Sequence, residues 1–394
     1  MNNWLLPAGI NESLPAEATA LEAMRRELLD VYRGWGYGFV MPPLVEYLES
    51  LSIAMGSQLD VQTFKITDQT NGRLMGVRAD ITPQAARIDS HRMSQLPHQP
   101  NRLCYMGTVL RTKSEEAGGS RSPIQVGAEL FGHEGIESDF EVISLMLETL
   151  KVAGVEKVLI DLGHIGILRS LIAAVGLDAE QQEVYLDQLE RKSIPEVDQW
   201  LATSDFDQSA CDMLRCLPTL NGDVSVLEAA KVKLAAAGSD MADAIEYLQA
   251  LITRLQSTFP NLAISLDLAD MRGYAYHTGI VYAAYVEGSG REVARGGRYD
   301  GIGEDFGNAR PATGFSTNLR TLVRLKGDVA PLAVEGILAP LDGDDELPSK
   351  VAELRSQGEI VVGQLAPLDQ LTAEEQGCNR ILSKQSGEWQ VVTA

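Results

Sequence analysis

The feature that most constrains the fold is a pair of apolar segments joined by a polar, glycine-containing loop between residues 101 and 132. The segments are NRLCYMGTVLRT and SPIQVGAELFG, and KSEEAGGSR separates them. Two strand-length runs around a turn favour an antiparallel pair. Gln125 and Glu129 are four residues apart on the second run, so their side chains point to the same face. Polar groups on a face that should be buried require a partner or a ligand.

Helix and strand patterns around this pair predict an α+β fold rather than a doubly wound sheet. We expect Ser13 to cap the first helix, with Pro15 in its opening turn, because the apolar residues that follow recur at helical spacing. Those residues are Leu21, Met24, Leu28, Tyr32 and Trp35. Residues 61–78, VQTFKITDQTNGRLMGVR, favour a hairpin because Asn-Gly accepts the positive φ of a tight turn. Ser138 and Glu141 predict a capping box for a later helix.

The chain has 394 residues, which is too long for one compact domain, and its pattern changes along the sequence. Residues 39–46, FVMPPLVE, are predicted to form an edge strand because prolines are unsuited to a sheet centre. Residues from about 164 to 258 are predicted to be mostly helical and are interpreted as an insertion. Short β and α patterns alternate over 331–394, which predicts a small C-terminal α/β domain after a main domain of residues 1–325.

The charge balance narrows the possible partners. The formal net charge is −22, with 55 acidic against 33 basic residues, and the sequence contains no cluster of lysine and arginine. A protein that binds the nucleic-acid backbone neutralises phosphates with such cations, so we expect no nucleic-acid partner. We attribute the acidity itself to a solubility surface.

The cysteine pattern and the hydropathy indicate the cellular compartment of the protein. The four cysteines are scattered without a CxxC pair, which argues against structural zinc and against a disulfide framework. No apolar run approaches the roughly 20 residues that span a bilayer, and the N-terminus lacks the features of a signal peptide. We therefore expect a cytoplasmic protein with no metal, no cofactor and no membrane partner.

Two of the candidate functional segments lie in the first third of the chain. In VRADITPQAAR, Asp80 and Thr82 precede a predicted helix, and taken alone they are an N-cap pair. Arg111 lies on the first of the two apolar runs, opposite Gln125 and Glu129 on the second. A cation, an amide and a carboxylate around one loop favour a site for a small charged molecule.

A third segment, MRGYAYHTGIVY, contains Arg272, Tyr276 and His277 beside two glycines. A lone histidine near aromatic residues is more often a core residue than a ligand-binding one. A fourth segment, residues 294–307, could pass for a phosphate-binding loop. It lacks both the GK[ST] ending and the GxGxxG spacing, so this indication is weak.

Taken together and in order, these segments resemble the catalytic domain of the class II histidyl-tRNA synthetases over roughly residues 1–325. The resemblance includes MPPLVE as motif 1 and the strand–loop–strand at 101–132 as motif 2. RGYAYHTG stands in place of the family signature RGLDYYTG, and GGRYDG precedes motif 3. The resemblance implies an antiparallel sheet flanked by helices, interrupted by a helical insertion.

The chain departs from that family where the synthetases hold ATP. Arg111 is kept, but Lys113 stands at the motif 2 glutamate position and Gly119 at the second arginine position. The closing arginine of motif 3 falls at Thr321, although a shift of one residue would let Arg320 replace it. Loss of one preorganised transition-state contact typically slows a reaction by roughly 10²–10³-fold. We therefore expect little or no adenylation.

The amino-acid side of the pocket is retained. The positions that the resemblance assigns to histidine binding are Asp80, Thr82, Arg111, Gln125, Glu129, Arg272, Tyr276 and His277. Asp80, Thr82 and Gln125 would meet the α-amino group. Arg272 would meet the carboxylate, and Glu129 the imidazole N–H.

The remaining positions differ in how closely they match. Tyr276 would line the site, and Arg111 would lie where a cation approaches the phosphate. Asp80 replaces a longer glutamate, and His277 replaces a tyrosine that contacts the imidazole.

A histidine pocket without ATP contacts, followed by only 64 residues after position 330, resembles the synthetase paralogues that are regulatory subunits of ATP phosphoribosyltransferase. The resemblance implies a homodimer that joins a short catalytic subunit in a hetero-octamer, activates it and mediates feedback by L-histidine. Two alternatives stay open. One is a histidine-activating ligase that acts without an anticodon-binding domain, and the other is a scaffold with a vestigial pocket.

Overall fold

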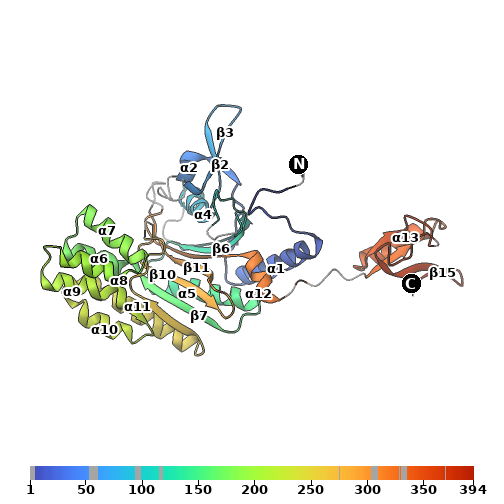
Figure 1. Cartoon of the computed structure of the whole chain (residues 1–394). Helices are drawn as coiled ribbons and strands as arrows, with labels where there is room; N and C mark the ends of the chain where they lie inside the picture. The colour runs from blue at the N-terminus through green and yellow to red at the C-terminus, as the bar shows by residue number, and fades with distance from the viewer. Residues whose placement is uncertain are drawn as a thin grey trace. The chain divides into compact units, whose positions relative to one another are not determined.

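The computed structural model describes residues 5–52, 61–93, 99–114, 119–274, 276–302, 309–327, 329, 335–368 and 370–394. The chain divides into two compact units, Met1–Val329 and Ala330–Ala394. The first unit contains the large sheet and most of the helices in Figure 1. Among the described helices, none is both long and apolar enough to cross a membrane.

A nine-stranded sheet forms the centre of the first unit. Its strands, in order across the sheet, are β1 (Gly38–Phe39), β5 (Asn101–Thr108), β6 (Ile124–Phe131), β12 (Ala312–Asn318), β11 (Glu292–Arg298), β10 (Ile280–Val286), β7 (Val158–His164), β9 (Ala263–Asp267) and β8 (Asn221–Gly222). The pairs β1–β5 and β7–β9 are parallel, and the other pairs are antiparallel. The predicted α+β class is thus confirmed, as is the antiparallel β5–β6 pair.

One face of this sheet packs against helices. Helices α1 (Pro15–Gly34), α5 (Ile136–Val152) and α12 (Leu319–Lys326) share a core with the side chains of β6 that point to them. Met24 and Leu28 on α1 and Val126 on β6 belong to that core and are buried. Such burial of large aliphatic side chains contributes about 1.5–3 kcal/mol each before the cost of ordering the chain. The alternate residues of β6 face the other side, where the candidate site lies.

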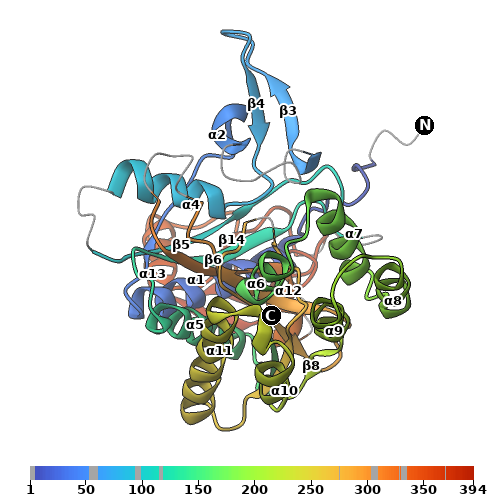
Figure 2. The ribbon, with the colours of Figure 1, turned by 90° about the vertical axis from the view of Figure 1, so that its left-hand side faces the viewer.

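A helical region follows β7. It comprises α6 (Ile165–Val175), α7 (Ala179–Glu190), α8 (Ile194–Ala202), α9 (Gln208–Cys216), α10 (Val226–Lys233) and α11 (Ser239–Thr258). Figure 2 looks onto these helices. Helices α6 and α11 pack against each other, and both contact the sheet through β10 and β7, respectively.

A smaller three-stranded sheet is formed by residues that precede α4 in the chain. Its order is β2 (Val45–Tyr47), β4 (Leu74–Val77) and β3 (Phe64–Thr67), with α2 (Leu48–Ser52) beside it. Strands β3 and β4 form the predicted hairpin, and Gly72 in its turn has φ +74°. Helix α4 (Thr82–Ile88) follows β4, and Pro83 lies in its first turn as predicted. A π-helical turn, η1 (Asp89–Met93), extends α4.

The second unit is a small α/β fold. Its sheet order is β14 (Val361–Gly363), β13 (Gly336–Ala339), β15 (Cys378–Gln385) and β16 (Glu388–Thr393), and α13 (Leu347–Ser356) packs on it. Ile337, Leu354 and Leu382 form part of its core. The sequence pattern does not indicate β15, because residues 378–385, CNRILSKQ, are mostly polar. This strand is defined by its pairing with β13 on one side and β16 on the other.

Three local predictions were wrong. Helix α1 begins at Pro15 with Leu14 in the N-cap position, and the buried Ser13 hydroxyl has no hydrogen-bond partner among the described residues. Helix α5 begins at Ile136, so Ser138 lies inside its first turn and donates to the Gly135 carbonyl instead of capping. Residues 40–44 lie between β1 and β2 rather than in one strand, because the two strands pair with different sheets.

Candidate functional site

The site begins with Glu129, which β6 places on the sheet face opposite α1 and α5. Its side chain is 1% exposed. Thr82 and Tyr105 donate hydroxyl hydrogen bonds to Glu129 Oε1 at 3.0 and 2.8 Å, and Tyr299 donates to Oε2. Helix α4 supplies Thr82 and β5 supplies Tyr105, so three distant segments converge on one carboxyl group.

Three hydroxyl groups and no cation contact this carboxyl group in the described part of the chain. Burial raises the pKa of Glu129 to about 8, although the hydroxyls of Tyr299, Tyr105 and Thr82 oppose the shift. A carboxyl group with such a pKa holds its proton at neutral pH, because its charge would be expensive in a dry pocket.

Asp80 and Gln125 form the second part of the site. Gln125 Nε2 donates to Asp80 Oδ1 at 2.8 Å, and Gln125 Oε1 accepts the Ile81 N–H at 2.9 Å. Asp80 Oδ1 also accepts the Thr82 N–H at 2.8 Å. The N-cap position of α4 is Ile81, so the interpretation of Asp80 and Thr82 as an N-cap pair was wrong. The side chain of Gln125 therefore joins β6 to the start of α4. Gln125 and Glu129 point to the same face, as predicted from their spacing.

Glycines on neighbouring strands make room for these side chains. Gly314 on β12 lies opposite Glu129, and a Cβ there would collide with Glu129 Oε2. Gly297 on β11 lies next in the same row, where a Cβ would stand 2.8 Å from His277 Nε2 and 2.7 Å from the Ile280 carbonyl. The Glu129 carboxyl group and the His277 ring thus occupy the space above two glycines.

His277 belongs to the segment that covers the sheet after β9. Its Nδ1 lies 3.1 Å from the Arg272 carbonyl oxygen, and its ring centre lies 6.4 Å from that of Tyr299. Burial lowers the pKa of His277 to about 4, so the ring is neutral at physiological pH. Tyr276 is 44% exposed, and its ring lies 4.2 Å from the His277 ring.

Arg272 lies at the β7 side of the same face and is surrounded by carboxyl groups. Its Nε donates to Asp270 Oδ2 at 2.7 Å, and its Nη2 donates to Asp161 Oδ2 at 2.9 Å. Glu292 Oε2 lies 3.6 Å from Nη1, and the Tyr285 hydroxyl lies 3.5 Å from it. Burial acts to lower the pKa of Arg272, but its hydrogen bonds to Asp270 and the nearby negative charges raise it overall, so its charge is permanent.

Arg111 lies at the opposite side, where its Nε donates to the Ala79 carbonyl at 3.3 Å. It lines a cavity of about 590 Å³ together with Gln125, Arg291 and Arg295. The other lining residues are Pro123, Tyr285, Gly290, Glu292, Val293, Ala294, Ser316, Thr317, Asn318 and Thr321. The cavity therefore reaches from Gln125 to the turn between β10 and β11.

One of the positions that depart from the synthetases, Thr321 on α12, lines this cavity. Lys113 is exposed on the loop after Arg111 and does not line it. Arg320 forms an ion pair with Glu17 on α1 and is not among the described residues that line the cavity. Two residues of the weak phosphate-loop candidate at 294–307, Ala294 and Arg295, line the cavity; residues 303–307 lie outside the described part.

The opposite face of the sheet holds a second buried charged group. Arg298 on β11 pairs with Asp139 on α5, with Nη2 to Oδ1 at 3.1 Å, and both side chains are nearly inaccessible. Tyr247 on α11 donates to the same carboxylate, and Arg298 also donates to Ser138 Oγ at 2.8 Å. This cluster fastens α5, the sheet and α11 together.

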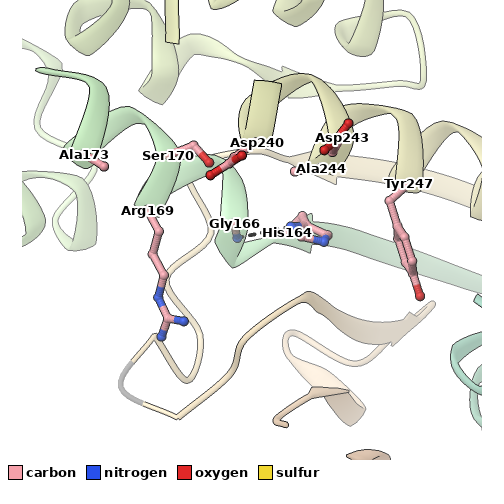
Figure 3. A pocket seen from close by; sticks show the side chains of 9 residues that line it. All are labelled: His164, Gly166, Arg169, Ser170, Ala173, Asp240, Asp243, Ala244 and Tyr247. Atoms are coloured by element: carbon pink, nitrogen blue, oxygen red, sulfur yellow. Dashed lines mark hydrogen bonds between the residues drawn. The ribbon is translucent and has the colours of Figure 1, made fainter. Parts of the chain in front are cut away.

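A second cavity, of about 510 Å³, lies between α6 and α11 (Figure 3). It is lined by His164, Gly166, Arg169, Ser170, Ala173, Asp240, Asp243, Ala244 and Tyr247. His164 Nδ1 accepts the Gly166 N–H, and burial lowers the pKa of His164 to about 4. Figure 3 shows Arg169 extending from α6 toward the segment after β9, where it donates to the Tyr274 carbonyl at 3.1 Å.

Sequence reasoning missed Tyr105, Tyr299 and Arg295. Tyr105 lies across from Gly127, the residue between Gln125 and Glu129 that shares their face, and this register is defined only when β5 and β6 pair. Tyr299 belongs to the quoted GGRYDG segment, but nothing local indicates that its hydroxyl meets a residue 170 positions away. No group of three or more potential metal ligands occurs in the described ranges.

The fold and this arrangement define the class of protein. Residues 9–322 match the family model described as histidyl-tRNA synthetase. The solved histidyl-tRNA synthetase from Nostoc sp. PCC 7120 superimposes with a TM-score of 0.77 over 100% of this chain and 97% of that one, at 21% identity. At that identity the likeness shows the fold alone. The first unit is thus a class II, histidyl-tRNA synthetase-like fold.

Full-length relatives narrow the class to one family. The ATP phosphoribosyltransferase regulatory subunit of Thioalkalivibrio sulfidiphilus is 53% identical over 392 residues, covering 100% of this chain and 98% of the relative. That of Pseudomonas aeruginosa is 49% identical over 99% of this chain and 98% of the relative. Residues 334–392 match the model described as ATP phosphoribosyltransferase subunit HisZ C-terminal domain. The chain belongs to the family of ATP phosphoribosyltransferase regulatory subunits.

A solved structure with a related name is also similar along nearly the whole chain. The ATP phosphoribosyltransferase regulatory subunit/histidyl-tRNA synthetase of Bacillus halodurans has a TM-score of 0.83 over 97% of this chain and 98% of that chain. The two sequences are 24% identical, so this match again supports the fold and not the ligand.

Proposed function

We propose that this chain activates a short catalytic ATP phosphoribosyltransferase subunit and mediates feedback on it by L-histidine. The observation that carries the proposal is the similarity to regulatory subunits along the whole chain, including the C-terminal unit. In this proposal residues 1–325 are a synthetase-like domain with a helical insertion at about 164–258. Residues 331–394 are a short α/β domain in place of an anticodon-binding domain. The complex works in the cytoplasm.

Histidine binds on the sheet face that carries Gln125 and Glu129. Asp80, Thr82 and Gln125 meet its α-amino group. They already lie together, because Asp80 Oδ1 accepts from both Gln125 Nε2 and the Thr82 N–H at 2.8 Å. Glu129 meets the imidazole. Its hydroxyl-only surroundings support this role, because the imidazole N–H is a further donor and an imidazolium would supply the missing positive charge.

We assign the other predicted residues to the edges of this site. His277 lies over Gly297 with Tyr276 beside it, and Arg111 lines the cavity that includes Gln125. His277 and Arg272 belong to the same segment, so a ligand that contacts His277 would change the conformation of the whole segment. Histidine shifts the complex toward its inhibited state only by binding that state more tightly.

We further propose that the chain forms a homodimer through residues 35–50 and that two or more such dimers enter a hetero-octamer. This segment presents large apolar side chains to solvent in the single chain: Met41 is 82% exposed and Leu44 49%. Together with Phe39 they form an apolar edge beside β1, and a self-complementary patch of this kind favours a twofold dimer. Light scattering at micromolar concentration tests it, and a monomer would contradict it.

The chain has no catalytic activity of its own in this proposal. The name of its relatives supports a regulatory role, and Lys113 and Gly119 stand where synthetases bind ATP. The competing function is a histidine-activating ligase. Histidine-dependent exchange of pyrophosphate into ATP separates the two, because only a ligase forms an aminoacyl-adenylate. Exchange at a hundredth of the rate of a true synthetase would favour the ligase.

The main experiment reconstitutes the chain with a short catalytic subunit and titrates histidine against phosphoribosyl-ATP formation. We expect activation by the wild-type chain and loss of activity as histidine is added. Glu129→Ala should abolish the histidine response, while Glu180→Ala, an exposed glutamate on α7, should leave it unchanged. An equal histidine response in all three proteins would place feedback in the catalytic subunit.

A further inference from the structure

We propose that Arg295, and not Arg272, binds the carboxylate of the amino-acid ligand. This inference rests on the proposed histidine site and adds to it the residue that recognises an α-carboxylate. The resemblance to the synthetases assigns this role to Arg272. The charges around the two arginines favour the other assignment.

Arg272 is already committed to carboxyl groups of the protein. Asp270 and Asp161 accept from its Nε and Nη2, and Glu292 lies 3.6 Å from Nη1. Asp270 and Asp161 already outnumber the single positive charge of Arg272, so a further carboxylate from a ligand would meet net negative potential. It would also have to displace a bond of 2.7–2.9 Å that is held between partly buried groups. Arg272 therefore orders its own segment.

Arg295 lies on the ligand face at the middle of the sheet. On β11 it is paired with Ser316 of β12, and Ser316 is paired with Gly127 of β6. Gly127 stands between Gln125 and Glu129 on the same face. The residue between Arg295 and β6 is therefore a serine, whose small side chain leaves space above β12. The cavity of about 590 Å³ occupies part of this space and includes Gln125, Ser316 and Arg295 in its wall.

The spacing suits an amino acid. Two strand steps separate Arg295 from Gly127, which is about 10 Å between backbones. In the proposed pose, the amino group of the ligand lies at Asp80 and Gln125 and its side chain points to Glu129. An Arg295 side chain that extends across β12 would then reach the carboxylate of this ligand. Ser316 lies on β12 between Arg295 and Gly127, and its hydroxyl is available as a second donor to the ligand carboxylate.

The local charge also favours Arg295. Arg111, Arg291 and Arg295 line the cavity, with Glu292 as the acidic residue in its wall. Arg295 Nη1 donates to Glu292 Oε1 at 3.2 Å across an exposed i,i+3 pair. An exposed pair of this kind contributes little free energy, so Glu292 holds the guanidinium only weakly. Three arginines around one cavity stand out in a chain whose net charge is −22.

The test compares two ligands on five proteins. L-histidine carries the carboxylate, and L-histidinamide replaces it with a neutral amide while keeping the amine and the imidazole. Calorimetric titration of the full chain measures both affinities for the wild type, Arg295→Ala, Arg295→Lys, Arg272→Ala and Arg33→Ala. Arg33 is an exposed α1 arginine paired with Asp30 and serves as the matched control.

We expect Arg295→Ala to weaken histidine binding by about tenfold to a hundredfold and to leave histidinamide binding within about twofold. Arg295→Lys should recover part of the loss, since it restores a charge without the planar fork. Arg272→Ala should weaken both ligands by the same factor, because it disorders the segment that covers them. Arg33→Ala should change neither.

The opposite pattern overturns the inference. If Arg272→Ala weakens histidine alone while Arg295→Ala weakens neither ligand, Arg272 holds the carboxylate. Equal losses of both ligands in Arg295→Ala would make Arg295 a structural residue and would also overturn it. A wild-type chain that binds neither ligand contradicts the proposed histidine site itself, which is a separate failure.

Discussion

Two buried carboxyl groups lie on opposite faces of the same sheet, and they are stabilised in different ways. Asp139 on α5 is paired with Arg298, so its charge is neutralised inside the protein. Glu129 on β6 is contacted by the hydroxyls of Thr82, Tyr105 and Tyr299, and no described cation pairs with it. Both side chains are equally inaccessible, at 0% and 1% exposure.

This difference indicates a structural role for Asp139 and a ligand-binding role for Glu129. A buried ion pair whose partners are both fixed holds elements together and has little capacity for a ligand. A buried carboxyl group with neutral donors is tolerated because it keeps a proton, and a basic ligand can change that state. The Asp139 cluster joins α5 to α11, whereas the Glu129 group lies beneath the segment that carries His277.

The largest effect is expected from breaking the ion pair. Arg298→Leu leaves Asp139 buried with Tyr247 as its remaining side-chain donor among the described residues. We expect a loss of about 3–5 kcal/mol in the free energy of unfolding, because an uncompensated buried charge remains. Urea unfolding measures this loss, and Arg26→Leu at an exposed α1 pair should show no measurable change. A loss below about 1 kcal/mol would mean that the pair does not fasten these elements.

The next effect comes from filling the space that Glu129 occupies. Gly314→Ala would place a Cβ against Glu129 Oε2 and force the carboxyl group away from Tyr299. We expect a loss of about 1–3 kcal/mol in stability, as for other overpacked sites, together with loss of histidine binding. Gly34→Ala is the matched control, because a Cβ there would meet nothing within 4 Å. Unchanged histidine affinity in Gly314→Ala would show that Glu129 is not part of the binding site.

The pH dependence of stability sharpens the comparison further. The folded chain holds the Glu129 proton up to about pH 8, whereas an unfolded carboxyl group releases it near 4.5. Folding therefore takes up a proton between these values. The contribution of Glu129 is fully present below pH 4.5 and falls as pH rises, by about 1.4 kcal/mol per unit at most, until about pH 8.

Glu129→Gln removes this titration. Urea unfolding of both proteins at several pH values between about 5 and 8 gives the free energy of unfolding as a function of pH. This free energy should fall more steeply with pH in the wild type, by a difference that corresponds to nearly one proton taken up on folding. Parallel slopes would show that Glu129 is ionised in the folded chain throughout this range.

The smallest effect is expected from deleting one hydroxyl. Tyr299→Phe removes one donor to Glu129 while keeping the ring that packs near Phe131. A neutral hydrogen bond of this kind contributes about 0.5–1.5 kcal/mol, and its loss should raise the pKa of Glu129 further. Tyr274→Phe, at a residue outside this network, is the control. A larger loss than in Gly314→Ala would reverse the order of these contributions.

Periodicity and turn chemistry predicted much of the frame. The spacing of four between Gln125 and Glu129 defined their common face, and Asn-Gly defined the β3–β4 hairpin. Helix starts were less predictable. Ser138 lies in the first turn of α5, where its hydroxyl donates to the nearby Gly135 carbonyl and accepts from Arg298. The contact with Arg298 depends on tertiary packing.

The sequence alone determined the α+β class, the paired strands β5 and β6, and the family to which the chain belongs. Local spacing and turn residues are sufficient for the class and the strand pair, because they act within a few residues, whereas the family followed from the resemblance of its motifs to those of known proteins. The charge state of Glu129, the commitment of Arg272 to Asp161 and Asp270, and the placement of Arg295 beside Gln125 were decided by the tertiary structure. They depend on burial and on strand register across the sheet, which bring together groups from distant parts of the chain.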